Sequence, residues 1–480
     1  MSATSTHETE ASLYMGAKSL TEGPPIKVPY SPFSTRTRAL IVVITALTGL
    51  VSPLSANMFY PSIQHVRDDF RTTQTSITWT VTAYIIAMAV FPLVWSNFAD
   101  GFGRKPVYAM SMLVYTCGSI GCALSHNLTA LIASRVVQSA GASAVQGAGA
   151  GTISDIYPRE KRGTALGIYY MGPLLGPCLG PLVGGYIGQS AGWRWVFWVL
   201  AIWGGIMFLL AVFVLPETHR RLVAAKHMIE QVNIPPPLSF KSNNPLLDIA
   251  TVRYPVVAIV MLHFAMIFGA YFTNATGLPL AFENVYGLSQ GVSGACFLPS
   301  GVGCILGSLI GGRITDILLR RRRALQVRTE AESKSEMPFD STKVPAEARL
   351  GAMWVGTGLF LCALICSGWI IENRLALGAF LAVQFFIGAG MAFTFQCLGG
   401  YLIDIFPTSS ARITGVQNFW RSTWAATIVQ IFPAMLQSIG WGWSYSVIFL
   451  ITLSSFALVQ VVVIRGSMLR QRYGPRDTCN

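Results

Sequence analysis

Three cationic or titratable side chains, Arg135, His263 and Arg421, lie in stretches that are otherwise almost entirely apolar. A charged side chain in hydrocarbon costs roughly 2.5–3.5 kcal/mol, so such residues usually mark a functional site. Arginine binds carboxylates through paired, charge-assisted hydrogen bonds, and histidine titrates near neutral pH. These residues are therefore the first candidates for chemistry, although a purely structural role stays open for each of them.

Amide side chains that could bind carboxyl or hydroxyl groups occur in the same stretches. The candidate substrate-binding residues are Arg135, Gln138, Arg421, Asn418, Gln384, His263 and Asn57, with Gln146 and Gln430 as further amides. All 21 acidic residues can be placed in tails, loops or helix ends, whereas an exporter of cations is expected to offer a buried carboxylate. This favours an anionic substrate such as a di- or tricarboxylate.

Twelve apolar stretches, each about long enough to cross a bilayer, must position these side chains. Of the 480 residues 52% are hydrophobic and 11% charged, against about 25% charged in a soluble protein. This composition predicts an all-α membrane protein with twelve transmembrane helices. The expected spans are 39–61, 76–97, 107–125, 129–152, 164–188, 194–215, 254–275, 291–312, 351–371, 376–400, 416–438 and 443–464.

The distribution of positive charge predicts the orientation. Of the 34 lysines and arginines, 28 fall in the tails and in the loops on the same side as the tails. The positive-inside rule then places both termini in the cytoplasm. The same scatter over short loops argues against a nucleic-acid partner for this basic chain. No cleavable signal peptide is recognisable near the N-terminus.

The chain reads as two related halves. We expect an N-terminal tail (1–38), a six-helix bundle (39–215), a cytoplasmic linker (216–253), a second six-helix bundle (254–464) with a loop insertion (320–350), and a C-terminal tail (465–480). Asp155-Ile-Tyr-Pro158 follows the fourth span, and Asp404-Ile-Phe-Pro407 follows the tenth. Matching elements in corresponding loops indicate duplication, which is common in secondary transporters.

The loop between spans 2 and 3 carries Asp100, Gly103, Arg104 and Lys105. An acid at one helix end, a glycine turn and two cations suit a charge latch between neighbouring helix ends. The alternative is a solvated loop that only obeys the positive-inside rule.

The fifth span has glycine at every fourth position, so one face of the helix lets another backbone approach closely. Prolines between the glycines each remove a helical hydrogen bond, and we expect them to bend the helix and make it pliable. The expected conformational residues are Gly172, Pro173, Gly176, Pro177, Gly180, Pro181, Gly184 and Gly185.

These motifs, in this order, resemble the major facilitator superfamily. The pattern in span 5 is similar to the family's antiporter signature. The runs Gly192-Trp-Arg-Trp-Val-Phe-Trp198 and Leu215-Pro-Glu-Thr218 are similar to the fungal drug:proton antiporter branch with twelve spans. That branch includes exporters of organic acids such as itaconate and citrate. Two departures weaken the loop motif, Ser96 in place of glycine and Gly101 in place of arginine.

The resemblance implies two pseudo-symmetric six-helix bundles and alternating access, with export coupled to proton antiport. It also implies that Arg135 and Gln138 belong to a motif tied to proton coupling. We therefore expect an exporter of a small organic acid, in a multi-pass protein of the plasma membrane that acts as a monomer. The expected partners are the substrate, protons and the lipid bilayer, with no cofactor and no enzymatic activity.

Other functions stay open at this point. The main rival is a multidrug:proton antiporter that exports neutral or cationic toxicants or another secondary metabolite. Since no buried acid is evident to carry a proton, facilitated diffusion of an anion down the membrane potential is also possible. A non-transporting sensor needs a long cytoplasmic tail, and an enzyme needs clustered catalytic residues. Neither feature is present in the sequence.

Overall fold

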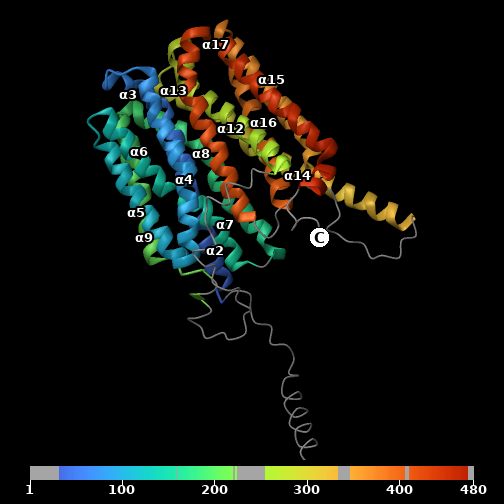
Figure 1. Ribbon diagram of the computed structural model, residues 1–480. Coiled ribbons are helices and arrows are strands. Elements are labelled where there is room, and N and C mark those ends of the chain that lie inside the picture. The colour runs from blue at the N-terminus through green and yellow to red at the C-terminus, as the bar shows by residue number, and fades with distance from the viewer. Residues whose placement is uncertain are drawn as a thin grey trace, which may run out of the picture.

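The computed structural model describes residues 32–157, 159–219, 222–223, 254–332, 346–405 and 410–473. Within these ranges every regular element is a helix (Figure 1). Parts of both predicted tails and most of the predicted linker lie outside the described residues. The long helices of the first half are α2 (Thr35–Met58), α4 (Gln74–Phe102), α5 (Arg104–Ala123), α6 (Leu128–Ala142), α7 (Ala144–Ile156), α8 (Arg159–Ala191) and α9 (Trp193–Phe213).

The second half repeats this arrangement. Its long helices are α12 (Pro255–Leu280), α14 (Leu298–Glu332), α15 (Met353–Glu372), α16 (Leu377–Ile405) and α17 (Ser410–Tyr473). The shorter elements of the chain are η1 (Tyr60–Ser62), α3 (Ile63–Asp69), η3 (Ala281–Val285), α13 (Gln290–Ala295) and η5 (Ala346–Ala352). Because α14 continues to Glu332, the first part of the predicted 320–350 insertion is helical.

The predicted twelve-helix fold is confirmed. Within the described ranges, ten stretches are long and apolar enough to cross a membrane. The last of them runs through Gly440, whose φ of 76° breaks α17 into two membrane-length helices. The remaining span is α8, whose 33 residues include three prolines and eight glycines, so it is less apolar than the ten stretches above.

Local sequence explains where several helices begin. The Ser34 hydroxyl accepts a hydrogen bond from Thr37 N at 3.2 Å at the start of α2, and Thr73 caps α4 in the same way. The Asn127 carboxamide oxygen accepts from Ala130 N at 2.8 Å at the start of α6. Such caps satisfy amide groups that the first helical turn leaves without partners.

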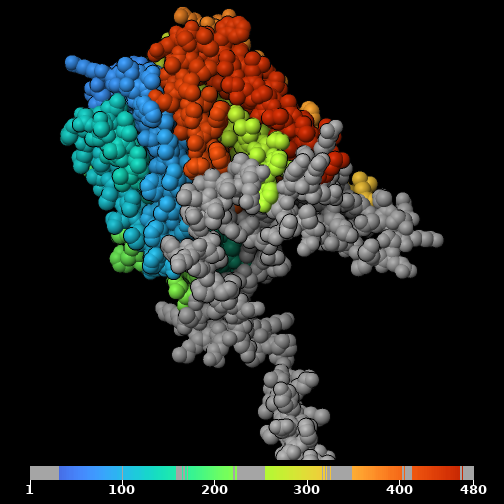
Figure 2. Space-filling model, viewed as in Figure 1, coloured from blue at the N-terminus to red at the C-terminus, as the bar shows by residue number. Residues whose placement is uncertain are grey.

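Each half packs around its own helix pairs. In the first half α2 lies on α8, and α5 lies between α6 and α9; in the second half α14 lies on α16 and α12 on α17. The halves meet where α4 packs on α17 and where α8 packs on α13 and α14. Figure 2 shows the contact of α4 with α17 on the surface of the molecule.

We call the end with α3 and α13 the closed end, and the opposite end, where α4 and α17 finish, the terminal end. Figure 1 shows the two bundles close together at the closed end and diverging toward the terminal end. At the closed end Gln290 donates to Ser62 at 2.9 Å, and Gly291 N donates to Gln189 at 2.7 Å. The Tyr60 ring also stacks on Phe297 across the boundary between the halves.

Candidate functional site

Arg135 is sealed inside the first half, with no exposed surface. Its Nη1 donates to Gln138 Oε1 at 2.7 Å and to the Ser55 carbonyl at 3.3 Å. The guanidinium lies 4.2 Å from the ring centre of Tyr84 and 5.0 Å from that of Phe59. Among the described side chains no carboxylate pairs with it, so carbonyl oxygens and ring faces stabilise the charge.

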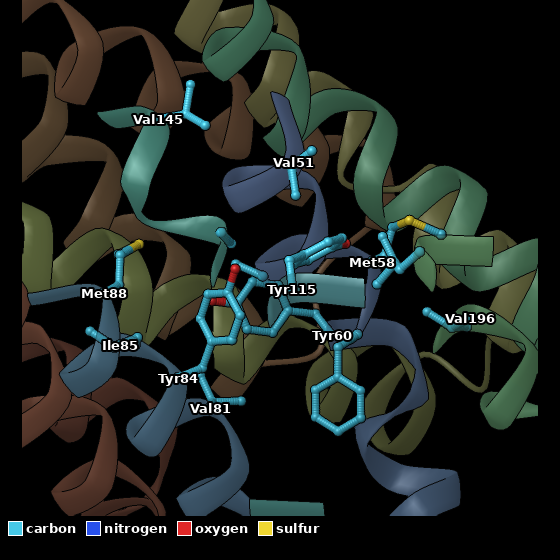
Figure 3. Close-up of a cluster of buried hydrophobic side chains, with 14 of the residues drawn as sticks. Val51, Met58, Tyr60, Val81, Tyr84, Ile85, Met88, Tyr115, Val145 and Val196 are labelled. Carbon is cyan, nitrogen blue, oxygen red and sulfur yellow. The ribbon is translucent and has the colours of Figure 1, made fainter. Parts of the chain in front are cut away.

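Buried phenols surround this arginine. Figure 3 shows Tyr60, Tyr84 and Tyr115 within one buried cluster that draws on η1, α4 and α5. Tyr84 donates to the Ser52 carbonyl at 2.9 Å, and the Tyr115 hydroxyl is 2.6 Å from that of Ser55. The arrangement ties Arg135 into the packing of the bundle. Whether it also contacts substrate stays a prediction.

Arg421 lies between the halves and is only partly buried. Its Nε and Nη2 both donate to Asn418 Oδ1, at 3.1 and 2.8 Å, and Asn418 in turn donates to the Met88 carbonyl of α4 at 3.0 Å. The guanidinium carbon lies 4.5 Å from the ring centre of Phe268 and 5.9 Å from those of Phe264 and Phe395. No described carboxylate neutralises Arg421.

Arg421 lies on the face of α17 that packs against other helices. On α17 the neighbouring turns place Gln417, Asn418 and Ala425 on the same face, and all three are buried. Thr423 and Thr427, which are exposed, occupy the opposite face. Arg421 is therefore a cation with accessible surface on the face of α17 that packs against other helices, where a bound anion could reach it.

Gln138 and Gln384 make corresponding contacts in the two halves. Gln138 Nε2 donates to Ser119 Oγ at 2.9 Å, and Gln384 Nε2 donates to Ser367 Oγ at 3.0 Å. Gln384 Oε1 accepts from Asn274 Nδ2 at 2.8 Å. Since both glutamines are fully buried, the structure shows them bonded to protein groups. Substrate contact by either one stays a prediction.

His263 and Asn57 also bond to protein groups. His263 is fully buried in the second half, with Nδ1 2.8 Å from Ser455 Oγ and Nε2 3.3 Å from Thr357 Oγ1. The Asn57 carboxamide donates to the Pro53 carbonyl on its own helix at 2.6 Å. Such contacts are typical of buried side chains with satisfied hydrogen bonds, and substrate binding by these residues stays untested.

Two of the predicted latch residues, Arg104 and Lys105, contact acids from outside the loop between spans 2 and 3. Arg104 Nε pairs with Asp155 Oδ2 at 3.0 Å. Glu217, which follows α9, accepts from Arg104 N at 2.9 Å and Lys105 N at 3.1 Å, so it caps the start of α5. Gly103 has a φ of 101°, and a methyl group there would lie 2.6 Å from Glu217 Oε2. The side chain of Asp100 lies outside the described residues.

The glycines of α8 allow close approach of two different partners. Methyl groups on Gly176 and Gly180 would lie 2.5 Å from Pro53 Cβ and 2.8 Å from Asn57 Cβ of α2. Gly172 and Gly184 contact carbonyl oxygens of α2. These contacts show the close backbone approach that the spacing predicts. The three prolines stay inside one continuous helix, and their part in gating is untested.

Gly185 faces the other half instead. A methyl group on it would lie 2.7 Å from the Gln290 carbonyl and 3.0 Å from Gly294 Cα of α13. One helix thus joins both kinds of interface, within a half and between halves.

Sequence reasoning missed two sets of residues at these sites. The Phe264, Phe268 and Phe395 rings around Arg421 come from α12 and α16. Glu217 was recognised only as part of a run that resembles a family motif. Glu217 and the loop motif with Arg104 and Lys105 can both be recognised in the sequence. Only the fold shows that they contact each other.

Two six-helix halves that meet at one end are typical of secondary transporters. Residues 45–328 match the model of the Major Facilitator Superfamily. Because that match covers more than half of the sequence, the chain belongs to the major facilitator superfamily. Its class is that of transporters and not of enzymes.

Fungal transporters are among its relatives. Efflux pump radE of Floropilus chiversii is 27% identical over 90% of this chain and 80% of its own length. Quinidine resistance protein 1 of Saccharomyces cerevisiae is 26% identical over 92% of this chain and 85% of its own length. The crystal structure of a D-xylose-proton symporter is 15% identical, with a TM-score of 0.64 over 87% of this chain and 96% of the symporter, which supports the fold.

Proposed function

We propose that this protein exports a small organic acid by alternating access, and that Arg421 binds the substrate carboxylate. The observation that carries the proposal is the partly buried Arg421 between the halves, with no described carboxylate paired to it. Asn418 engages Nε and Nη2 but leaves Nη1 for a substrate oxygen. A charge-assisted hydrogen bond from arginine to a carboxylate is about twice as strong as a neutral one.

The surroundings of Arg421 also bear on the type of acid. Its neighbours Phe264, Phe268 and Phe395 stack on one another, with the centres of the Phe264 and Phe395 rings 4.1 Å apart. An aromatic wall beside a cation suits an acid that also has an apolar part. Among di- and tricarboxylates, one like itaconate, with an unsaturated carbon group, fits better than the more polar citrate.

The remaining features of the proposal follow from sequence and family. We propose a monomer in the plasma membrane, with the terminal end and both termini in the cytoplasm, because positive charge is concentrated on that side. Export would be driven by proton antiport or by the membrane potential acting on the anion. The structure would then be open to the cytoplasm, where an exporter loads its substrate.

A multidrug antiporter is the second candidate. The name of the Saccharomyces cerevisiae relative connects that protein with quinidine resistance, and quinidine is an amine. Aromatic rings such as Phe268 would also suit a large apolar compound. In that case Arg421 would hold helices together rather than bind substrate.

Export from strains that carry single substitutions tests the proposal. Arg421→Ala should keep its amount at the membrane and lose organic-acid export, whereas Arg421→Lys should retain part of it. The loss of one charged hydrogen bond, about 1.5–3 kcal/mol, corresponds to roughly a 10- to 150-fold weaker apparent affinity. Thr423→Ala, two residues away on the exposed face, is the matched control. Normal acid export from Arg421→Ala would refute the proposed site.

A further inference from the structure

Buried polar atoms without hydrogen-bond partners gather at the closed end. Among the described residues, five such atoms lie on η1, α3, η3 and α13: Tyr60 OH, Gln64 Oε1, Glu283 Oε1, Gln290 Oε1 and Ser293 Oγ. Contacts of α13 with η1 and of α12 with α3 link the two halves at this end, and α13 also contacts η3 within the second half. Buried polar atoms in proteins nearly always have hydrogen-bond partners. Five atoms without partners at this end of the boundary are therefore unusual.

Glu283 is the acidic residue of this group, and its position is firmly fixed. It lies in η3, a π-helical turn in which Tyr286 N donates to the Ala281 carbonyl at 3.2 Å. The preceding Phe282 is fully buried against Phe297 and Phe380. Single π-helical turns inside or after a long helix occur often at functional sites.

Among the described residues, no cation forms an ion pair with Glu283. The charged groups that act on it are Arg67 and Asp68, both from α3 of the other half. Arg67 is already paired with Asp68, since Nε and Nη2 lie 2.8 and 2.7 Å from Asp68 Oδ1. That pair is close to neutral as a unit, so it compensates the Glu283 charge poorly.

Of the other elements packed there, the turn before α16 carries Arg374, which is exposed and precedes Leu375, whose carbonyl accepts from Tyr286 OH at 3.0 Å. The sequence of α13 has no ionisable side chain, and η1 contributes only the Tyr60 phenol. On α3 itself, Asp69 is engaged by Trp193 and Arg194, and His65 is exposed. An ionised Glu283 would thus have one buried oxygen without a donor, whereas a protonated Glu283 removes the charge and adds an O–H donor.

We propose that Glu283 is a proton-binding gate residue, ionised when the closed end opens and protonated when the two halves meet there. This goes beyond the proposed function, because it concerns the gate and not the substrate. One proton from the solution outside the closed end forms the O–H bond at each closure, and reopening releases it to water. Linkage then requires that acid on that side favours closure.

Labelling of an engineered thiol tests the proposal without any substrate. Ser293→Cys, in a background with Cys296→Ser, places the reporter on α13, where the side chain is fully buried in the closed state. A membrane-impermeant maleimide is added from the closed-end side at pH 8 and pH 5. The rate is divided by that of Asn373→Cys, an exposed position on the same side, which corrects for ionisation of the thiol itself.

With Glu283 intact, the corrected labelling rate should be severalfold lower at pH 5 than at pH 8. The decrease should be at most about tenfold for each pKa unit by which closure changes the proton affinity of Glu283. Glu283→Gln should label slowly at both pH values, and Glu283→Asp should keep the pH dependence. The matched control Glu372→Gln removes another acid near the closed end, one that caps Trp441 and Gly442 within the second half, and should keep it too.

Full pH dependence in Glu283→Gln would overturn the proposal, as would a rate independent of pH in the parent protein. Size-exclusion profiles show whether each variant folds, and the conservative Asp variant provides an informative result if Gln does not. Export of organic acids is not measured here, so failure of the gate assay is separate from failure of the Arg421 experiment.

Discussion

Two adjacent glycines of α8 should respond to the same substitution in different ways. Gly184 contacts the Met58 carbonyl within the first half, whereas Gly185 contacts Gln290 and Gly294 of the second half. We predict that Gly184→Ala lowers stability, and that Gly185→Ala shifts the equilibrium between open and closed states while stability is largely retained.

The structure sets the magnitudes. A methyl group on Gly185 would lie 2.7 Å from the Gln290 carbonyl oxygen, so the halves must separate by about 1 Å to reach ordinary contact distance. Overpacking of this kind costs about 1–3 kcal/mol. For Gly185→Ala the cost applies only when the halves are closed, so the closed population should fall by a factor of roughly 5 to 150 relative to the open state.

At Gly184 the clash is with backbone in both states, because α2 and α8 belong to the same half. The cost of about 1–3 kcal/mol is offset by up to about 1 kcal/mol from the better helix propensity of alanine. Gly205→Ala on α9 is the control, since no atom lies within 4 Å of the added methyl group. It should leave stability unchanged or raise it slightly.

Thermal unfolding in detergent and the Ser293→Cys labelling rate separate the two effects. Gly184→Ala should unfold several degrees below Gly205→Ala, and Gly185→Ala should label faster than the parent without a comparable loss of stability. If Gly184→Ala and Gly185→Ala behaved alike in both assays, the assignment of the two faces of α8 would be wrong.

Three further substitutions test the remaining contacts. Asp155→Asn removes the negative charge that Arg104 Nε contacts at 3.0 Å and should cost about 1–3 kcal/mol; the double variant with Arg104→Gln should lose less than the sum of the single losses in unfolding measurements. Asn274→Ala leaves Gln384 without a buried donor and should lower the unfolding temperature by a similar free energy. His263→Gln should keep export and its pH dependence if the histidine only bonds to its two hydroxyl neighbours; loss of the pH dependence alone would give it a role in proton coupling.

Periodicity in the sequence was enough to predict the scaffold. The four-residue glycine repeat in α8 indicated close packing with another backbone, because glycines at that spacing share one helix face. The structure identifies the partner as α2, at Pro53, Asn57 and Met58. The sequence could not name it, since any helix with a suitable surface satisfies the same pattern.

The degree to which a charged side chain is buried could not be predicted from periodicity. Arg135 and Arg421 both stand in apolar stretches, yet the first is sealed among rings and carbonyls and the second has accessible surface. Glu283 lies near the end of a membrane-length helical stretch, but its buried oxygen depends on where α3 of the other half lies. Burial of this kind depends on tertiary contacts between distant segments, which helical periodicity does not encode.

The two halves share some buried contacts and differ in others. Gln138 bonds to Ser119 as Gln384 bonds to Ser367, and each pair joins corresponding helices, α6 with α5 and α16 with α15. The carbonyl oxygen of each glutamine has a different donor, Arg135 in the first half and Asn274 in the second. A guanidinium brings a positive charge to this position and a carboxamide does not. The shared amide–hydroxyl bonds therefore belong to the scaffold. The two halves differ in the charge of the donor that bonds to each glutamine oxygen.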